Sequence, residues 1–405
     1  MEEDIVSEFD LINPTEAHSM LREMIRDFVD KSLEPQALIH DKEEKFNLEL
    51  FKELGDLGLL GLTVSEKYGG SELDTVSAVI IHEELSSSDP AFTLSYLAHS
   101  MLTANNLSVN GSEEQKSRYL PGLCSGELIG CMAMSEPDYG TDVMGMKTTA
   151  ELNSEGNWVI NGNKMWITNG SIDEDGTPAD IVWLYAKTGE SENGRAEIST
   201  FIVEKGMQGY SVGQKIYDKL GMRASNTAEL VFENCIVPPE NLVGSVGGSV
   251  LHMMRNLELE RIALAAMSLG IARRSLHEMN NYATERISFG KPIRAYGQIQ
   301  RHIAESYAEY KAMQAYVYNT ARMINLESGG YRLDTDGVKL FATTAAKNIA
   351  DRAIQVMGGY GYVGEYVVER LWRDSKLLEI GGGTLESHQK NMTKELFKNP
   401  DFIYK

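Results

Sequence analysis

The spacing of apolar residues divides the chain into a helical part, a strand-rich part and a second helical part. Between about residues 13 and 122, apolar positions recur at three- and four-residue intervals, which predicts helices over 18–32, 48–59, 78–86 and 91–109. The glycine- and proline-containing stretches 68–70 and 121–122 are predicted to break these helices. The first region is therefore expected to be all-helical.

From about residue 128 the pattern changes to short runs rich in β-branched and aromatic residues. The runs cover residues 158–160, 165–168, 180–185, 199–203 and 229–232. Residues 161–163 and 169–170 are predicted turns between them, and the acidic segment 172–176 is a predicted exposed loop. Short strands with this spacing are typical of an antiparallel barrel or sandwich.

Helical spacing returns from about residue 248 onward. Helices predicted over 251–285, 298–326, 334–356 and 383–396 are long enough for a four-helix bundle. The expected fold class is α+β, with a helical domain at 1–126, a β domain at 127–240 and a helical bundle domain at 241–405. Strands and helices do not alternate along the chain, which excludes a Rossmann-type nucleotide site.

One carboxylate lies on an apolar helical face. Glu260 shares this face with Leu257, Leu264 and Met267, whereas Glu258 points to nearly the opposite side. A carboxylate among apolar residues is costly unless it is paired, protonated or catalytic. The pattern leaves two alternatives: an ion pair with a distant arginine or lysine, or a general base with a raised pKa.

Charge and composition exclude several classes of protein. The 405 residues include 38 Lys and Arg against 59 Asp and Glu, a net charge of −21, so neither nucleic acid nor a membrane surface is an expected partner. Cys124, Cys131 and Cys235 lack metal or disulfide spacing, and no metal is expected. No apolar run reaches membrane-spanning length. The acidic N-terminus is unlike a targeting peptide, so the expected location is a bacterial cytoplasm or, for a trimmed chain, the mitochondrial matrix.

The most specific local pattern lies at residues 355–365, where glycine occupies positions 358, 359, 361 and 364. Glycines let the backbone approach a ligand closely, and exposed N–H groups can hold phosphate. Arg370 and Asp374 follow this segment and are predicted to pair on the next helix. A plain turn between two helices is the alternative interpretation of the glycines.

This segment resembles the C-terminal signature of the acyl-CoA dehydrogenase family. Residues 133–142 resemble the family's first signature, with Tyr139 where the family has a small residue. Residues 161–170, 201–207, 219–227 and 379–384 are most similar to the branch that acts on isovaleryl-CoA. The resemblance extends from about residue 19 to 397. It implies a homotetrameric FAD enzyme that dehydrogenates an acyl-CoA and passes electrons to electron-transfer flavoprotein.

The resemblance also implies site residues. Arg286 matches the contact to the FAD pyrophosphate, and the glycine turn matches a contact from a neighbouring subunit. Gln298 stands one position after the family's glutamine, which is Gly297 here. The implied cofactor contacts are Met134, Ser135, Gly140, Thr141, Trp166, Thr168, Arg286, Gln298, Gln355, Gly358, Gly359, Thr384 and Glu386. The implied substrate contacts are Thr141, Glu258, Arg261, Gly382 and Gly383.

The position of the catalytic base is a departure from many family members. Their glutamate lies in the loop position that is Gly382 here, and glycine cannot take a proton. The isovaleryl and long-chain branches place a glutamate on a helix just before an arginine, which Glu260-Arg261 matches. The resemblance thus implies that Glu260 is the base and that Gly382 offers its N–H to the thioester oxygen.

The expected substrate is a short branched acyl-CoA like isovaleryl-CoA. The alternative is a long-chain, aromatic or dicarboxylic acyl-CoA, because the long-chain branch also uses a helix base. A flavin oxidase or monooxygenase, and a non-catalytic DNA-associated relative, are further alternatives. The net charge of −21 argues against the DNA-associated relative.

Overall fold

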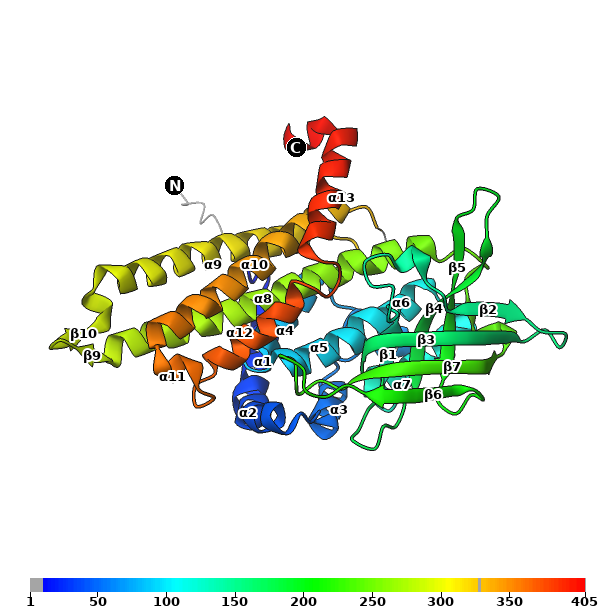
Figure 1. Cartoon of the computed structure of the whole chain (residues 1–405), viewed down its shortest axis with the longest axis horizontal. Helices are drawn as coiled ribbons and strands as arrows, with labels where there is room; N and C mark the ends of the chain where they lie inside the picture. Colours follow the sequence, from blue (N-terminus) through cyan, green and yellow to red (C-terminus); the bar gives the residue numbers. More distant parts are fainter. Residues whose placement is uncertain (1–9, 327–328, 405) are drawn as a thin grey trace, which may run out of the picture.

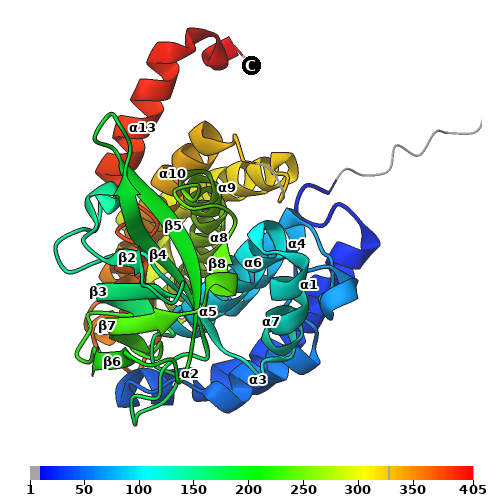
Figure 2. The same ribbon diagram turned by 90° about the vertical axis from the view of Figure 1, so that its right-hand side faces the viewer.

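The computed structural model describes residues 10–326 and 329–404, and it confirms the predicted order of helices, sheet and helices. In Figure 1 the β-sheet occupies one end of the molecule and the long C-terminal helices extend to the other. The N-terminal helices lie along one side of both, as the second view in Figure 2 also shows.

The N-terminal region consists of short helices with polar N-caps, among them Asp74 and Asp89. The predicted break at 121–122 is wrong, because the helix continues through Pro121 and ends at Gly126, whose φ of 77° is the left-handed conformation that favours glycine. The helices are α1 (Glu16–Phe28), α2 (Glu34–Glu43), α3 (Leu48–Asp56), α4 (Thr75–Ser86), α5 (Pro90–His99), α6 (Asn105–Asn110) and α7 (Glu113–Ser125), with π-helical turns η1 (Val29–Leu33) and η3 (Ser100–Ala104).

The middle region is one sheet with the strand order β6-β7-β3-β2-β4-β5-β8, and β1 pairs with β4. Most neighbours are antiparallel, but β1 and β2 each pair with β4 in parallel. The strands are β1 (Gly130–Ala133), β2 (Thr149–Leu152), β3 (Trp158–Thr168), β4 (Ile181–Glu190), β5 (Ala196–Glu204), β6 (Tyr210–Lys215), β7 (Thr227–Val237) and β8 (Leu242–Val243). Because β8 pairs with β5, the sheet continues slightly beyond residue 240.

The predicted turn at 161–163 is also wrong, since β3 continues through it. A register shift against β7 lies between Ile160 and Gly162, so the glycine marks an irregularity within a strand. A Cβ at Gly162 would lie 2.5 Å from the Thr148 Oγ1. Close backbone approach therefore explains this glycine.

The C-terminal region is built on one long helix, α8, which packs against α4, α9, α10 and α12. The fourth member of the bundle is α12 and not the helix predicted at 383–396: that helix, α13, packs on α10 and then projects from the body (Figure 1). The elements are α8 (Val250–Glu285), β9 (Ile287–Ser288), β10 (Lys291–Pro292), α9 (Gly297–Met323), α10 (Arg332–Met357), α11 (Gly359–Tyr362), α12 (Val368–Leu378) and α13 (Leu385–Lys398).

The predicted pairing of Arg370 with Asp374 is not found. Arg370 donates to the carbonyl of Ser88 at 2.7 Å, and Asp374 accepts the N–H of Met222 at 2.5 Å. Burial raises the pKa of Asp374 to about 7. The two residues therefore join α12 to different parts of the chain, Arg370 to the N-terminal helices and Asp374 to the loop before β7.

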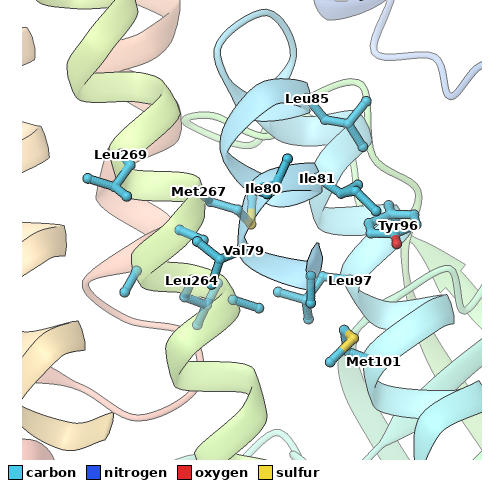
Figure 3. Packing of buried hydrophobic residues seen from close by; sticks show 14 of the residues in the cluster. Val79, Ile80, Ile81, Leu85, Tyr96, Leu97, Met101, Leu264, Met267 and Leu269 are labelled. Carbon is cyan, nitrogen blue, oxygen red and sulfur yellow. The ribbon is translucent and has the colours of Figure 1, made fainter. Parts of the chain in front are cut away.

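The main core lies where α4 and α5 meet the middle of α8. Figure 3 shows Leu264 and Met267 from α8 facing Val79 and Ile80 from α4, with Leu97 close by. This packing fixes the part of α8 that carries the predicted base. None of the described helices is long and apolar enough to cross a membrane.

Candidate active site

Glu260 lies on α8, one helical turn before the buried Leu264. Its carboxylate forms no hydrogen bond or ion pair with any described residue, so the ion-pair alternative has no partner within this part of the chain. Burial raises the pKa of Glu260, although the charges of Lys339 and Arg261 oppose the change. A partly buried carboxylate with a raised pKa and no ion-pair partner among the described residues is suited to accept a proton.

Gly382 lies directly against this side chain. A Cβ at Gly382 would lie 2.7 Å from the Leu264 Cδ1 and 3.3 Å from the Glu260 Cδ. Its φ of 65° is in the left-handed region, where glycine is favoured. Among the described residues, none accepts the N–H of Gly382 or Gly383. Free backbone donors beside a carboxylate can stabilise negative charge that develops on a carbonyl oxygen.

The carbonyl oxygens of the same loop accept hydrogen bonds from side chains elsewhere in the chain. Arg261 donates from Nε to the Gly382 oxygen at 3.3 Å and forms an ion pair with Asp336 at 3.0 Å. Lys339 donates to the Gly383 oxygen at 2.6 Å, and the His388 Nε2 lies 2.9 Å from the same atom. The loop therefore exposes its N–H groups while its oxygens are bound.

Asp336, Lys339 and His388 were not identified from the sequence. All three are fully buried, the first two on α10 and the third on α13. A local signal for the first two did exist: Asp336 and Lys339 lie one turn apart on a predicted helix, and apolar residues flank the lysine on both sides.

Two implied substrate residues beside Glu260 have structural partners. Glu258 accepts the N–H groups of Gly330 and Tyr331, each at 3.0 Å, and thereby anchors the segment before α10. Arg261 is bound to Asp336 and Gly382, as described above. Substrate contact by either residue stays a prediction, and the structure gives each a role in holding other parts of the chain.

A second group of implied residues lies at the ends of β1 and β3. Trp166 has a φ of 60° and is 56% exposed, where β3 shifts register against β7. A positive φ is rare for a bulky residue and is often found at functional sites. The N–H of Met165 donates to the Ser135 oxygen at 2.9 Å, and the buried Lys164 donates to the Met134 oxygen at 3.0 Å. The strand β3 therefore positions the β1 segment.

The remaining members of this group flank these two segments. Thr168 ends β3 and is partly buried, and Gly140 and Thr141 are exposed in the loop after β1. In the same loop, the Tyr139 ring packs against Gly145, where a Cβ would lie 2.7 Å from its Cε1. Gly145 therefore makes room for the large residue in the first signature.

Thr384 and Glu386 begin α13, directly after the glycine loop. The Thr384 hydroxyl caps the helix by accepting the N–H of Ser387 at 3.3 Å. Glu386 is exposed in the first turn, where hydrogen bonds from its own backbone N–H and then from the Thr384 side chain lower its pKa. Polar groups at this helix start lie next to Gly383 and Gly382 in the chain.

A third group of implied residues lies elsewhere. Arg286, Gly358 and Gly359 line one cavity of about 470 Å³. A Cβ at Gly358 would meet no atom within 4 Å, and the exposed Arg286 guanidinium has no hydrogen-bond partner among the described residues. Gln355, shortly before Gly358 in the chain, and Gln298, after Arg286, are both exposed. A free guanidinium beside an open glycine turn is suited to bind phosphate groups.

The third group is remote from Glu260 in one chain. Arg286 follows the last residue of α8, so the two residues are about 39 Å apart at a helical rise of about 1.5 Å per residue. Figure 1 shows β9, β10 and α11 at the end of the molecule away from the sheet. One chain therefore carries two half-sites that do not face each other. Among the described residues there is no cluster able to hold a metal ion.

Comparisons with protein families match nearly the whole chain. Residues 15–127 match the model described as "Acyl-CoA dehydrogenase, N-terminal domain", 131–235 the middle domain and 250–397 the C-terminal domain. The chain is 43% identical over 386 residues to the mitochondrial isovaleryl-CoA dehydrogenase of Oryza sativa subsp. japonica, covering 95% of this chain and 92% of that protein.

Solved structures give the same picture. Butyryl-CoA dehydrogenase from Megasphaera elsdenii superimposes with a TM-score of 0.89 at 34% identity, covering 95% of this chain and 98% of that one. A glutaryl-CoA dehydrogenase from Mycobacterium smegmatis in complex with FADH2 does so with a TM-score of 0.87 at 30% identity, covering 94% and 95%.

Proposed function

The chain belongs to the acyl-CoA dehydrogenase family, and from this premise we propose that it dehydrogenates a short branched acyl-CoA, isovaleryl-CoA foremost. As a member of that family it is an oxidoreductase that uses FAD. In this proposal electron-transfer flavoprotein takes up the electrons, and the working enzyme is a homotetramer.

The observation that carries the proposal is the contact between Glu260 and Gly382. A carboxylate with no ion-pair partner among the described residues lies against a loop whose backbone N–H groups are free. Proton abstraction next to a thioester needs both a base and a donor for the oxygen that becomes negatively charged.

In this proposal the residues around the glycine loop have separate roles in removing the α-proton. Glu260 takes the proton from Cα, which its raised pKa favours because the protonated form is then less costly in a desolvated site. The Gly382 N–H donates to the thioester oxygen as negative charge develops there. Arg261 and Lys339 keep the two loop carbonyls turned away from that oxygen.

The residues implied for FAD are compatible with its chemical groups. Trp166 exposes an aromatic surface for the ring system, and Arg286 with the glycine turn offers donors for the pyrophosphate. Bound by these residues, FAD would supply the hydride-accepting chemistry of the reaction at Cβ. Because the two half-sites of one chain are about 39 Å apart along α8, Arg286 would come from a neighbouring subunit.

The substrate proposal rests on the space at the loop. Gly381, Gly382 and Gly383 present only backbone near the base, which leaves room for a methyl branch at Cβ. The relative from Oryza sativa, an isovaleryl-CoA dehydrogenase, supports a substrate branched at this carbon. One methylene changes kcat/KM by about 10- to 200-fold in a pocket, so related short thioesters should react more slowly.

Anaerobic bleaching of the flavin by a panel of CoA thioesters tests this proposal. Isovaleryl-CoA should give the highest kcat/KM, above its straight-chain isomer valeryl-CoA, its α-branched isomer 2-methylbutyryl-CoA, and butyryl-CoA. Palmitoyl-CoA or an aromatic or dicarboxylic acyl-CoA that is more than about tenfold better would overturn the substrate and leave the reaction class intact. Failure of every thioester to bleach the flavin would overturn the reaction class.

A further inference from the structure

Three buried side chains hold a loop that has no side chains of its own. Gly381, Gly382 and Gly383 lie in sequence, and the φ angles of the last two are 65° and 104°. Glycine loses more conformational freedom on folding than any other residue, so a triple-glycine loop needs external contacts to stay fixed. Here these contacts come from Arg261, Lys339 and His388, which all bind the carbonyl oxygens.

Lys339 has the least usual surroundings of the three. Its side chain is fully buried on α10, and its ammonium group donates to the Gly383 oxygen at 2.6 Å. No carboxylate of the described residues lies within ion-pair distance of it. A buried ammonium without an ion-pair partner is costly, so a nearby negative charge is needed to offset its desolvation.

The other charged groups around Lys339 indicate which carboxylate offsets the desolvation of its ammonium group. Asp336 is already bound by Arg261 at 3.0 Å and by the His388 Nδ1 at 2.6 Å. Glu260 has no bonded partner among the described residues, and it is the strongest source of favourable charge interaction for Lys339. The charged and titratable groups around Lys339 are Glu260 and Arg261 from α8, Asp336 from α10, Glu379 after α12, and His388 from α13, while Arg332 pairs with Asp336.

We propose that Lys339 is a positioning residue for the dehydrogenation: it fixes Gly383 through a hydrogen bond and, through its charge, keeps Glu260 ionised and ready to accept the α-proton. The inference rests on the proposed function of Glu260 as the base. It adds a residue from another helix to that site.

The protonation of Lys339 itself depends on pH. Burial lowers the pKa of Lys339 to about 7, against the attraction of Glu260. Below about this pH the lysine carries its charge, and that charge lowers the pKa of Glu260 against the effect of burial. The positive charge therefore opposes premature protonation of the base.

His388 belongs to the same network and has to be considered with it. Its two ring nitrogens face two acceptors, the Asp336 carboxylate and the Gly383 carbonyl, which is the geometry of a protonated ring. Burial and then the charges of Lys339 and Arg261 lower the pKa of His388, against its hydrogen bond to Asp336. If rising pH removes a proton from Lys339 or from His388, the hydrogen bonding of that side chain to the Gly383 oxygen would weaken.

The pH profile of flavin reduction in the holoenzyme tests the proposal. Lys339→Met and Lys339→Gln remove the charge, Lys339→Arg retains it, and Lys390→Met removes an exposed lysine from α13 as the control. Without the charge, the acidic limb of the reduction rate should move to higher pH by about one unit, the low end of the range for an opposite charge close by. In Lys339→Arg, the pH at which the reduction rate falls on the acidic side should be close to the wild-type value. In Lys390→Met this pH should be unchanged.

The free energy of unfolding as a function of pH gives a readout that needs no substrate. The pKa of Lys339 lies at about 7 in the folded protein, below the usual 10.5. Between these values the unfolded chain binds more protons, so the free energy of unfolding should rise with pH in the wild type and rise less in Lys339→Met.

The outcomes separate this proposal from the proposed function. An acidic limb that is unchanged in both neutral variants, or stability curves that run parallel to the wild type, would overturn the role of Lys339 and leave Glu260 as the base. A wild-type holoenzyme that no thioester bleaches would instead overturn the proposed function, and the stability curves would still report the charge on Lys339.

Discussion

At the scale of single residues, Glu260 and Gly382 constrain each other. The helix base occupies the space next to the loop, so that a side chain at 382 would collide with Leu264 and press against Glu260. Helical spacing in the sequence was enough to select Glu260 as a candidate, because a carboxylate on an apolar face is visible locally, but the choice between an ion pair and a base came from the resemblance. The roles of Asp336 and Lys339 could not be predicted, because they depend on tertiary contacts with Arg261 and the glycine loop.

A first prediction concerns this close contact. Gly382→Ala should lower the free energy of unfolding by about 1–2 kcal/mol for the left-handed backbone alone, and should also slow flavin reduction. The matched control is Gly381→Ala, whose Cβ would meet only the Leu377 oxygen, at an ordinary 3.6 Å. Urea unfolding and stopped-flow reduction measure the two effects. Equal losses in both variants would contradict the claimed contact.

At the scale of elements, periodicity predicted most helices but not the irregular strand. β3 continues through the predicted turn at 161–163, and it later places Trp166 at a φ of 60°. Turn-forming residues do not distinguish a hairpin from a bulge, because both need a local departure from extended backbone. Likewise Pro121 suggested a break, whereas the helix ends at Gly126. The position of α12 in the bundle depended on packing that no local pattern encodes.

The docking of α12 leads to a second prediction. The pKa of Asp374 is about 7 in the folded protein, above its usual 3.8, so the folded state binds more protons between these values. Its contribution to stability is therefore present at low pH and lost as pH rises toward 7. In Asp374→Asn, which keeps an acceptor for the Met222 N–H, stability relative to wild type should increase over this window.

Urea unfolding at several pH values measures this difference. The gain should reach at most about 4 kcal/mol, at about 1.36 kcal/mol per pKa unit for a shift from 3.8 to about 7. Asp351→Asn, at an exposed position of α10, serves as the control and should follow the wild type. A difference between Asp374→Asn and wild type that stays constant with pH would show that the Asp374 carboxyl titrates normally.

At the scale of the whole molecule, the two half-sites are separated along α8, since Glu260 lies within the helix and Arg286 directly follows its last residue. The resemblance to a known family implied the residues of both, from Trp166 to Arg286 and Gly358, and their roles stay predictions. Sequence alone could not show their separation within one chain, since that depends on the uninterrupted length of α8. The fold and its class were predictable, and the resemblance already implied a contact from a neighbouring subunit; the distance along α8 supports that proposal.

This division leads to a third prediction. Arg286→Ala removes a free guanidinium from the cavity at Gly358 and should weaken FAD binding by about 10- to 100-fold, the effect of losing one hydrogen bond to a charged group. The control, Arg301→Ala, removes an exposed arginine on α9 that pairs with Glu305. Flavin content after gel filtration, together with the oligomeric state, measures the effect. A monomer that retains FAD tightly would contradict the shared site.

The most direct test of the central claim is anaerobic stopped-flow reduction of the flavin in Glu260→Gln with isovaleryl-CoA. Glu278→Gln, on the same helix but paired with Arg274 and outside the predicted site, is the matched control. We expect Glu260→Gln to retain FAD and to be reduced about 10²–10⁴-fold more slowly, the usual contribution of a positioned general base, while Glu278→Gln stays near the wild-type rate. A near-normal reduction rate in Glu260→Gln would contradict the account.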